Sequence, residues 1–212
     1  MTIITMATPR AASTSQNLCS LVATTLRCVP YSSSSLWPSR IISHNASVRI
    51  WGVEGREFTI RPGSREDAAE AARLWMHSAE EHTAHDRIYT TSPAAERVMR
   101  RFLAELAGSN HSFLFVAESA ARTVGFISGE LREGSPTFQA KTWASVDDVF
   151  VEPDYRNLGI GRALLESVKA WASERGADGV SLQVAAANER GRKFYKELGF
   201  REISVYEVLE FE

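Results

Sequence analysis

The chain has 212 residues, of which 44% are hydrophobic and 24% are charged, an ordinary composition for a globular protein. Its 24 basic and 26 acidic residues give a net charge of −2, so no overall cationic field indicates nucleic-acid binding. No run approaches the ~20 apolar residues of a membrane span, and two cysteines, Cys19 and Cys28, are too few for a disulfide framework. These counts exclude fibrous, disulfide-stapled and membrane-spanning classes and fit one compact domain.

The composition changes sharply near residues 52–56. Residues 1–53 contain sixteen Ser or Thr, four Arg and no Asp, Glu or Lys, whereas the rest carries 20 basic and 26 acidic residues. An acid-free segment rich in Ser and Arg is typical of an organelle transit peptide, and a misassigned upstream start is the alternative. We expect residues 1–53 to be mostly disordered and 54–212 to form the folded domain. The expected location is the cytoplasm, or an organelle if the leader is a transit peptide.

The folded part alternates between strand and helix patterns. Strands are predicted at residues 58–61, 113–118, 123–131, 143–151, 179–184 and 200–211. Helices are predicted at residues 64–79, 92–107, 160–175 and 188–198. Ser64 followed by Asp67 is typical of a helix N-cap with its reciprocal acid. The order of elements predicts an α/β fold with one mixed sheet and helices on both faces.

A strand ending at Val151 leads through a short loop directly into a helix. The loop holds Gly159 and Gly161, and glycines let the backbone approach a ligand closely or take a positive φ. The free N–H groups at the start of a helix and the positive end of its dipole favour phosphate. Arg156 and Arg162 add positive charge beside it. The loop therefore predicts a pyrophosphate site.

Two familiar nucleotide motifs do not fit this loop. A Walker loop needs Gly-x-x-x-x-Gly-Lys followed by Ser or Thr, which is absent from the sequence. A dinucleotide fingerprint needs a third Gly or Ala where Leu164 stands, and an acid at the end of the next strand, which finishes at Gln183-Val184.

The pattern Arg156-x-x-Gly159-x-Gly161 after a Val-x-Pro strand end resembles the coenzyme-A motif of the GNAT superfamily of N-acetyltransferases. A second stretch, residues 188–200, is similar to that family's Asn-x-x-Ala-x-x-Phe-Tyr-x-x-x-Gly-Phe segment, with Gly191 at the usual alanine. The resemblance covers residues 57–212. It implies an α/β fold with a mostly antiparallel sheet flanked by helices.

The resemblance also implies acetyl-CoA as co-substrate. No metal is expected, because no Cys accompanies His82 and Asp86 and the sequence has no His-Glu-x-x-His pattern. The strand before the loop would separate from its neighbour, and backbone groups of Val149, Phe150 and Val151 would pair with the pantetheine arm. Asn188 would cap its helix and touch the same arm. The pyrophosphate would be held by N–H groups of the loop and the first helical turn: Asn157, Leu158, Gly159, Ile160, Gly161, Arg162 and Ala163.

Two residues match catalytic positions of the family. Asp147 matches an acidic general base, which must take a proton from an amine of pKa near ~10.4 before the amine can attack. Its neighbour Asp148 is expected on the opposite face of the strand. Tyr195 matches the tyrosine that protonates the departing thiolate. The alternatives are a structural acid at Asp147 and a core aromatic at Tyr195.

These observations predict an N-acetyltransferase that moves the acetyl group from acetyl-CoA to a primary amine by direct attack in a ternary complex. The alternative is a non-catalytic acyl-CoA-binding sensor or recruiting module. The acceptor is expected to be a small-molecule or peptide amine, and Glu80, Glu81 and Asp86 hint at a cationic one. Because members of the family often pair through their last strands, a homodimer is also expected.

Overall fold

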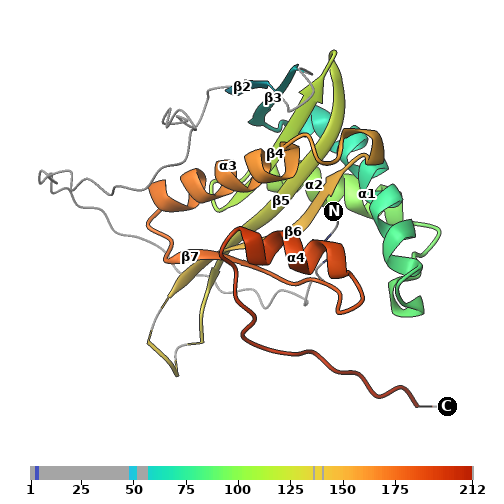
Figure 1. The fold of residues 1–212 in the computed structure, drawn as a ribbon, viewed down its shortest axis with the longest axis vertical. Coiled ribbons are helices and arrows are strands. Elements are labelled where there is room, and N and C mark those ends of the chain that lie inside the picture. Colours follow the sequence, from blue (N-terminus) through green and yellow to red (C-terminus); the bar gives the residue numbers. More distant parts are fainter. Residues whose placement is uncertain (1–2, 5–47, 52–56, 136, 140, 212) are drawn as a thin grey trace, which may run out of the picture. The chain divides into compact units, whose positions relative to one another are not determined.

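The structure is a computed structural model that describes residues 3–4, 48–51, 57–135, 137–139 and 141–211 (Figure 1). Its strands are β1 (Ile3–Ile4), β2 (Val48–Trp51), β3 (Glu57–Pro62), β4 (Ser112–Ser119), β5 (Arg122–Glu133), β6 (Thr142–Val151) and β7 (Gly179–Leu182). Its α-helices are α1 (Ala68–Thr83), α2 (Ala95–Leu106), α3 (Ile160–Glu174) and α4 (Glu189–Glu197). Single 3₁₀ turns are η1 (Arg65–Asp67), η2 (Arg87–Tyr89) and η3 (Pro153–Tyr155).

One sheet contains all the described strands. Its order is β1-β6-β5-β4-β3-β2, with every neighbouring pair antiparallel. β7 also pairs with β6, and this pair is parallel. The predicted α/β class, with a mostly antiparallel sheet and the order strand, two helices, three strands, helix, strand, helix, is confirmed.

Two short stretches of the acid-free leader lie in the described structure, and both are strands. β2 pairs with β3 in the register Val48 to Ile60, and β1 pairs with β6. The sheet therefore begins before the expected boundary at residue 54, because β2 satisfies backbone groups of β3 that would otherwise form an open edge. The rest of residues 1–53 lies outside the described residues, so the expected disorder there stays a prediction.

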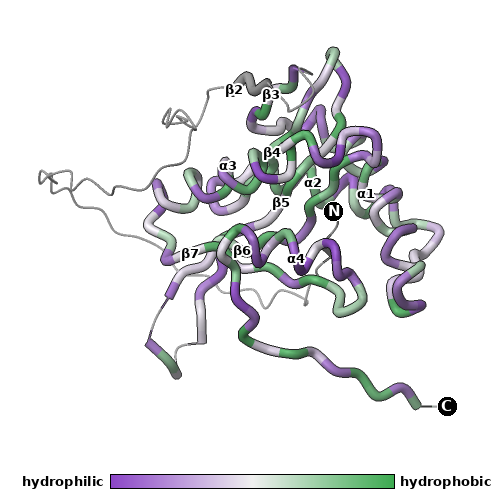
Figure 2. Tube along the Cα trace, viewed as in Figure 1, coloured by the Kyte–Doolittle hydropathy of each residue, from purple (hydrophilic) through white to green (hydrophobic). Residues whose placement is uncertain are grey.

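Helices cover both faces of the sheet, and each face has its own apolar cluster. One cluster joins the sheet to α3 and α4, and the other joins it to α1 and α2. In Figure 1, α3 lies in front of the strands and α1 and α2 lie behind them. Because both faces are covered, the central strands are buried along most of their length, with Asp147 and Asp148 of β6 among the buried residues. Figure 2 colours the chain by hydropathy and shows hydrophobic stretches along these strands.

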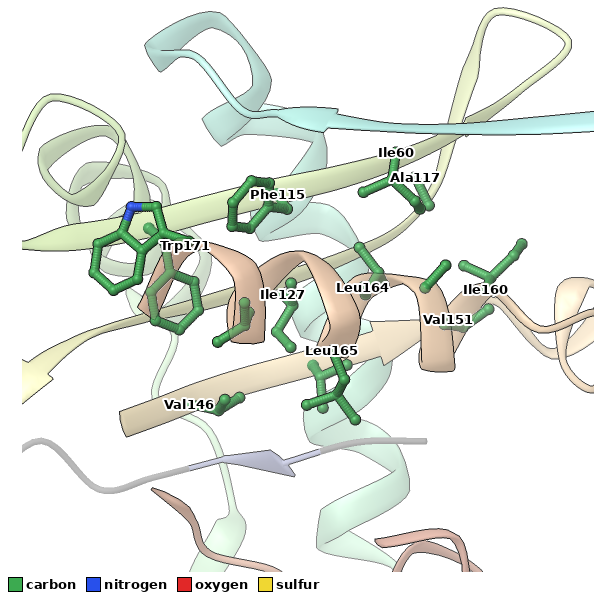
Figure 3. Packing of buried hydrophobic residues seen from close by; sticks show 14 of the residues in the cluster. Ile60, Phe115, Ala117, Ile127, Val146, Val151, Ile160, Leu164, Leu165 and Trp171 are labelled. Atoms are coloured by element: carbon green, nitrogen blue, oxygen red, sulfur yellow. The ribbon is translucent and has the colours of Figure 1, made fainter. Parts of the chain in front are cut away.

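The cluster on the α3 side fixes the direction of α3 across the sheet. Leu164 and Ile160 point from the helix onto the strands, near Ile127 and Val151 (Figure 3). At the far end of α3, the ring of Trp171 packs 4.9 Å from that of Phe113. The N-terminus of α3 is thereby held at the carboxyl end of β6, where the predicted phosphate loop lies.

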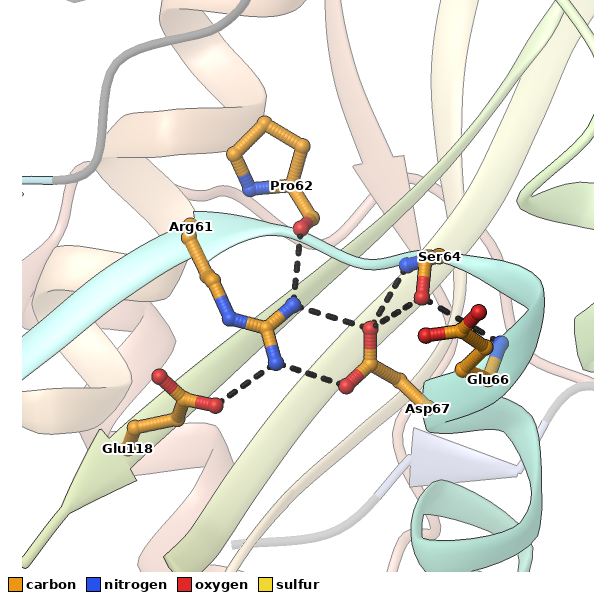
Figure 4. A network of polar contacts seen from close by, with 6 residues as sticks. All are labelled: Arg61, Pro62, Ser64, Glu66, Asp67 and Glu118. Atoms are coloured by element: carbon orange, nitrogen blue, oxygen red, sulfur yellow. Dashed lines mark hydrogen bonds and ion pairs between the residues drawn. The ribbon is translucent and has the colours of Figure 1, made fainter. Parts of the chain in front are cut away.

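A polar network joins the start of the sheet to η1. Arg61 donates to both oxygens of Asp67, at 2.8 and 2.7 Å, and to Glu118 at 2.6 Å (Figure 4). Ser64 and Asp67 form the reciprocal cap expected from the sequence, which is confirmed. Both oxygens of this half-buried carboxylate accept hydrogen bonds, and those from Arg61 lower the pKa of Asp67 to about 2.

The predicted last strand is not formed. Residues 201–211 belong to no helix or strand and are all exposed. The prediction of a strand is wrong for this chain on its own, because no neighbouring strand supplies hydrogen bonds along the segment. Within the described residues, no helix is long and apolar enough to cross a membrane.

Candidate active site

Asp147 lies at an irregularity in β6. The register between β5 and β6 shifts between Ser128 and Gly129, whose partners are Asp148 and Val146, so Asp147 is the extra residue of a β-bulge. The strands approach so closely there that a side chain at Gly129 would collide with the carbonyl of the facing strand. Bulges re-aim side chains next to functional sites.

The carboxyl group of Asp147 is buried and only half satisfied. Its Oδ1 accepts a hydrogen bond of 2.8 Å from Arg132 Nη2, and its side chain is 5% exposed. Its Oδ2 has no hydrogen-bond partner in the described structure. Burial raises the pKa of Asp147 to about 6, against the lowering effect of Arg132. Near neutral pH the group is therefore a buried carboxylate with one oxygen available.

The neighbouring Asp148 is held by different elements. Its Oδ1 accepts from Trp75 Nε1 of α1 at 2.8 Å, and its Oδ2 accepts from Ser128 at 3.4 Å. Burial is the main cause that raises the pKa of this carboxyl, and the negative charge of Asp147 raises it further. Asp148 thus joins α1 to the sheet, whereas Asp147 is held by Arg132 of β5, and the prediction that Asp147 alone acts as the base stays a prediction.

β6 and β7 separate partway along their length. They pair only from Trp143 to Val146, against Gly179 to Leu182. Beyond that point β5 still occupies one edge of β6, and the other edge is paired at Asp148 and Val149 with the two residues of β1. The predicted separation of the two strands is therefore present, next to the predicted pantetheine residues Val149, Phe150 and Val151.

The loop after β6 leads into α3, and no side chain accepts a hydrogen bond from the backbone N–H groups at the start of that helix. Asn157 has a φ of 66° and Gly159 a φ of 91°, so the chain turns twice through the left-handed region before α3. Gly159 is the N-cap, and no side chain caps the helix. The N–H groups of Ile160, Gly161 and Arg162 precede the first intrahelical donor, Ala163, whose N–H donates to Gly159. This geometry suits an anion.

Arg156 points away from these N–H groups. Its Nε donates to the carbonyl of Val151 at 2.8 Å, and its Nη2 pairs with Glu81 of α1 at 2.6 Å. The guanidinium also lies 5.3 Å above the ring of Phe150. The side chain thus fastens the loop to β6 and α1, and its predicted role in cofactor binding stays a prediction.

Tyr195 and Asn188 both lie on or beside α4. Tyr195 is 3% exposed, and its ring contacts the rings of Phe194 and Phe200 at 5.4 and 5.7 Å. Its hydroxyl has no hydrogen-bond partner in the described structure, and burial raises its pKa far above the ordinary value. Asn188 Oδ1 accepts from the N–H of Gly191 at 2.9 Å, so the predicted helix cap is present.

The site collects residues that the sequence did not single out. Arg132 holds Asp147, and Trp75 and Ser128 hold Asp148. The sequence did offer one signal for Arg132, because this arginine directly follows the largely apolar strand predicted at residues 123–131. Two of the three acids expected to attract a cationic acceptor are already engaged: Glu81 by Arg156, and Asp86 as the cap of η2.

The described residues contain no group of three or more His, Cys, Asp or Glu side chains placed to hold a metal ion. Besides Asp147 Oδ2 and Tyr195 Oη, the buried atom without a partner in this part of the chain is Ser78 Oγ on α1. Buried polar atoms without partners are rare in folded proteins, and each calls for a reason.

The chain is similar in sequence to known acetyltransferases. The acetyltransferase (GNAT) family matches residues 71–200. An uncharacterized N-acetyltransferase of Methanocaldococcus jannaschii is 27% identical over 161 residues, covering 76% of this chain and 68% of its own. An N-alpha-acetyltransferase of Sulfurisphaera tokodaii is 35% identical over 111 residues, covering 49% of this chain and 65% of its own.

A solved aminoglycoside N-acetyltransferase in complex with CoA shares the fold. Its TM-score is 0.59 at 16% identity, and the match covers 74% of this chain and 96% of that one. The family match spans more than half of the chain and contains both the loop and α4. The chain therefore belongs to the acetyltransferase (GNAT) family and is an N-acetyltransferase that depends on acetyl-CoA.

Proposed function

We propose that this enzyme acetylates a primary amine by direct attack within a ternary complex, with Asp147 as general base and Tyr195 as general acid. The observation that carries the proposal is the pair of buried atoms without partners, Asp147 Oδ2 and Tyr195 Oη. An unpaired buried polar atom costs about 1–3 kcal/mol, so a reacting group that pairs with it is the expected compensation.

The proposed step balances as follows. Asp147 Oδ2 takes one proton from the ammonium form of the acceptor, and the freed amine nitrogen attacks the thioester carbonyl carbon. A carbon–nitrogen bond forms and the carbon–sulfur bond breaks. Tyr195 gives its hydroxyl proton to the leaving thiolate and regains a proton from the nitrogen, and Asp147 releases its proton to solvent. The raised pKa of Tyr195 keeps this hydroxyl protonated at neutral pH, while the pKa of Asp147 near 6 leaves it deprotonated. No cysteine follows residue 28, so the described domain offers no thiol for a covalent intermediate.

We place the pantetheine arm along the edge of β6 beyond Val146 and the pyrophosphate at the N–H groups of the loop. The support is the separation of β6 from β7 and the uncapped start of α3. β1 lies on the same edge, at Asp148 and Val149. Because β1 has two residues, its displacement breaks few hydrogen bonds, and deleting residues 1–5 is expected to lower the KM for acetyl-CoA.

The acceptor is a primary amine, of a small molecule or a peptide. Relatives support this class, since one is named an N-alpha-acetyltransferase and a structure of the same fold is an aminoglycoside N-acetyltransferase. The test is thiol release from acetyl-CoA with polyamines, aminoglycosides and peptides bearing free amino termini. Release with one class supports the proposal, whereas CoA binding without release from any amine favours the non-catalytic acyl-CoA-binding alternative.

A homodimer is the proposed assembly, formed through residues 201–211. This segment exposes six large apolar side chains at 55 to 91% exposure: Ile203, Val205, Tyr206, Val208, Leu209 and Phe211. β7 pairs only with β6 among the described strands, so its other edge can accept a strand from a second copy. Light scattering of the full chain and of a chain ending at Phe200 tests this: loss of a dimer on truncation supports it, and a full-length monomer contradicts it.

A further inference from the structure

The positive charge beside the phosphate loop does not come from the arginine that the motif suggests. Arg156 is 14% exposed, and its guanidinium is neutralised by Glu81 at 2.6 Å. A second donor of the same group is used by the carbonyl of Val151. Its charge is therefore paired with Glu81, and two of its N–H donors hold α1 and β6 together, so it is not an uncompensated charge facing the loop.

A different arginine reaches the loop from α4. Arg190 Nη2 donates to Asn157 Oδ1 at 3.0 Å, across 33 positions of sequence. Asn157 is the residue at which the loop first turns through a positive φ, two positions before Gly159. The contact therefore places a guanidinium beside the loop that leads into the uncapped N-terminus of α3.

The charge of Arg190 is not compensated within the described part of the chain. Its partner is a neutral carboxamide, and no carboxylate there forms an ion pair with it. Arg192, two positions along the same helix, differs in this respect, because it pairs with Glu202 at 2.7 Å. A guanidinium has five N–H donors in a planar fork, so most donors of Arg190 remain available to an oxyanion.

We propose that Arg190 binds a phosphate group of coenzyme A at the loop, with the carboxamide of Asn157 positioning its guanidinium. The proposal rests on the proposed function, which places the diphosphate at the same loop. Arg190 contacts the loop at Asn157, two positions before the uncapped N-terminus of α3, so a phosphate bound at the loop would meet a full positive charge as well as the backbone donors. Charge-assisted hydrogen bonds between arginine and phosphate are among the stronger ones in proteins.

The test compares Arg190→Gln with Arg192→Gln in the full chain. We expect Arg190→Gln to raise the KM for acetyl-CoA about 10-fold with kcat nearly unchanged, because the lost contact lies far from the reacting bond. Arg190→Lys should recover part of the loss, since a lysine keeps the charge but not the fork. Arg192→Gln removes an exposed arginine of the same helix that pairs with Glu202 instead of the loop, and it should leave both constants at the wild-type values.

A second variant examines the positioning residue. Asn157→Gly keeps the positive φ, which glycine adopts without strain, but removes the carboxamide. We expect a rise in KM for acetyl-CoA smaller than that of Arg190→Gln, and no further rise when both changes are combined. Additive effects of the two changes would overturn the positioning role of Asn157.

Acetyl-dephospho-CoA identifies which phosphate is bound. If Arg190 contacts the 3′-phosphate, Arg190→Gln raises the KM for acetyl-CoA and leaves that for acetyl-dephospho-CoA unchanged. If it contacts the diphosphate, both KM values rise equally. An Arg190→Gln enzyme with wild-type KM for both substrates overturns the inference but not the proposed function, whereas a wild-type chain without affinity for coenzyme A overturns both.

Discussion

Asp67 and Asp147 are both mostly buried acids that accept hydrogen bonds from an arginine, yet their surroundings drive their pKa values in opposite directions. Asp67 has a side chain that is 12% exposed, and both its oxygens are bonded by Arg61, with Ser64 in addition. The side chain of Asp147 is 5% exposed, and one oxygen is left unpaired. The pKa falls to about 2 in the first case and rises to about 6 in the second.

The difference shows how a structural carboxylate and a reactive one can be distinguished. At Asp67, hydrogen bonding outweighs burial, so the network stabilises the ionised form and ties η1 to the sheet. At Asp147, burial outweighs the single bond from Arg132, so the proton is held more tightly and remains exchangeable near neutral pH. The cost of the unpaired oxygen is acceptable where a substrate supplies the missing partner.

The largest expected effect is that of Asp147→Asn. The carboxamide can still accept from Arg132 but cannot take a proton, so kcat/KM for the amine should fall by about 10³-fold. Thiol release with the preferred amine measures the loss, and circular dichroism confirms the fold. Asp67→Asn, the same chemical change at the satisfied acid, is the control and should keep the wild-type kcat. Activity within a factor of three of wild type in Asp147→Asn would exclude this residue as the base.

Tyr195→Phe should change activity and stability in opposite directions. Loss of the general acid is expected to lower kcat by about 10²-fold, the low end of the range for proton transfer. Because the hydroxyl is buried without a partner, its removal should raise the free energy of unfolding by about 1 kcal/mol. Urea denaturation and thiol release on the same preparation measure both quantities. A destabilised Tyr195→Phe protein would mean that the hydroxyl has a partner in solution.

The sequence predicted those features that depend on neighbours along the chain. The reciprocal cap of Ser64 and Asp67, and the uncapped helix start after Gly159, each need only a few consecutive residues, and both are present. The choice of Asp147 over Asp148 followed from alternation along a strand and from the resemblance to the family. Their separate partners agree with it, and the catalytic role stays a prediction.

The features that were missed depend on how distant segments are brought together. The bulge at Asp147 follows from the register of β5 against β6, which no local pattern specifies. Arg132 reaches Asp147 across 15 positions, and Arg190 reaches Asn157 across 33. The same limit explains the last strand: residues 201–211 have strand-forming side chains, but whether they form a strand depends on a neighbour outside the segment.

Asp67→Asn, used above as a control for activity, is expected to lower the stability of the fold. Loss of the paired carboxylate and of its cap should lower the free energy of unfolding by about 1–2 kcal/mol. The pKa of Asp67 is lowered from 3.8 to about 2, so its stabilising effect is present above pH 4 and is lost as the pH falls toward 2. The difference in unfolding free energy between wild type and variant, measured by urea denaturation, should therefore shrink over that interval. A constant difference would contradict the assignment.

The smallest expected effect on activity is that of Arg132→Gln. This variant tests directly whether burial and Arg132 act in opposite directions on the pKa of Asp147. In the wild-type enzyme the base must be deprotonated, so kcat/KM should fall as the pH drops through the pKa of Asp147, about 6. The charge and hydrogen bond of Arg132 lower that pKa, so their removal moves the acid limb of the profile to higher pH. At a pH above the shifted limb the base is deprotonated again, and activity there should differ from that of the wild type by about twofold or less. Arg122→Gln, which removes an exposed arginine of the same strand, should leave the limb in place. If the limb stays near 6 in Arg132→Gln, the proton that controls the reaction is not on Asp147.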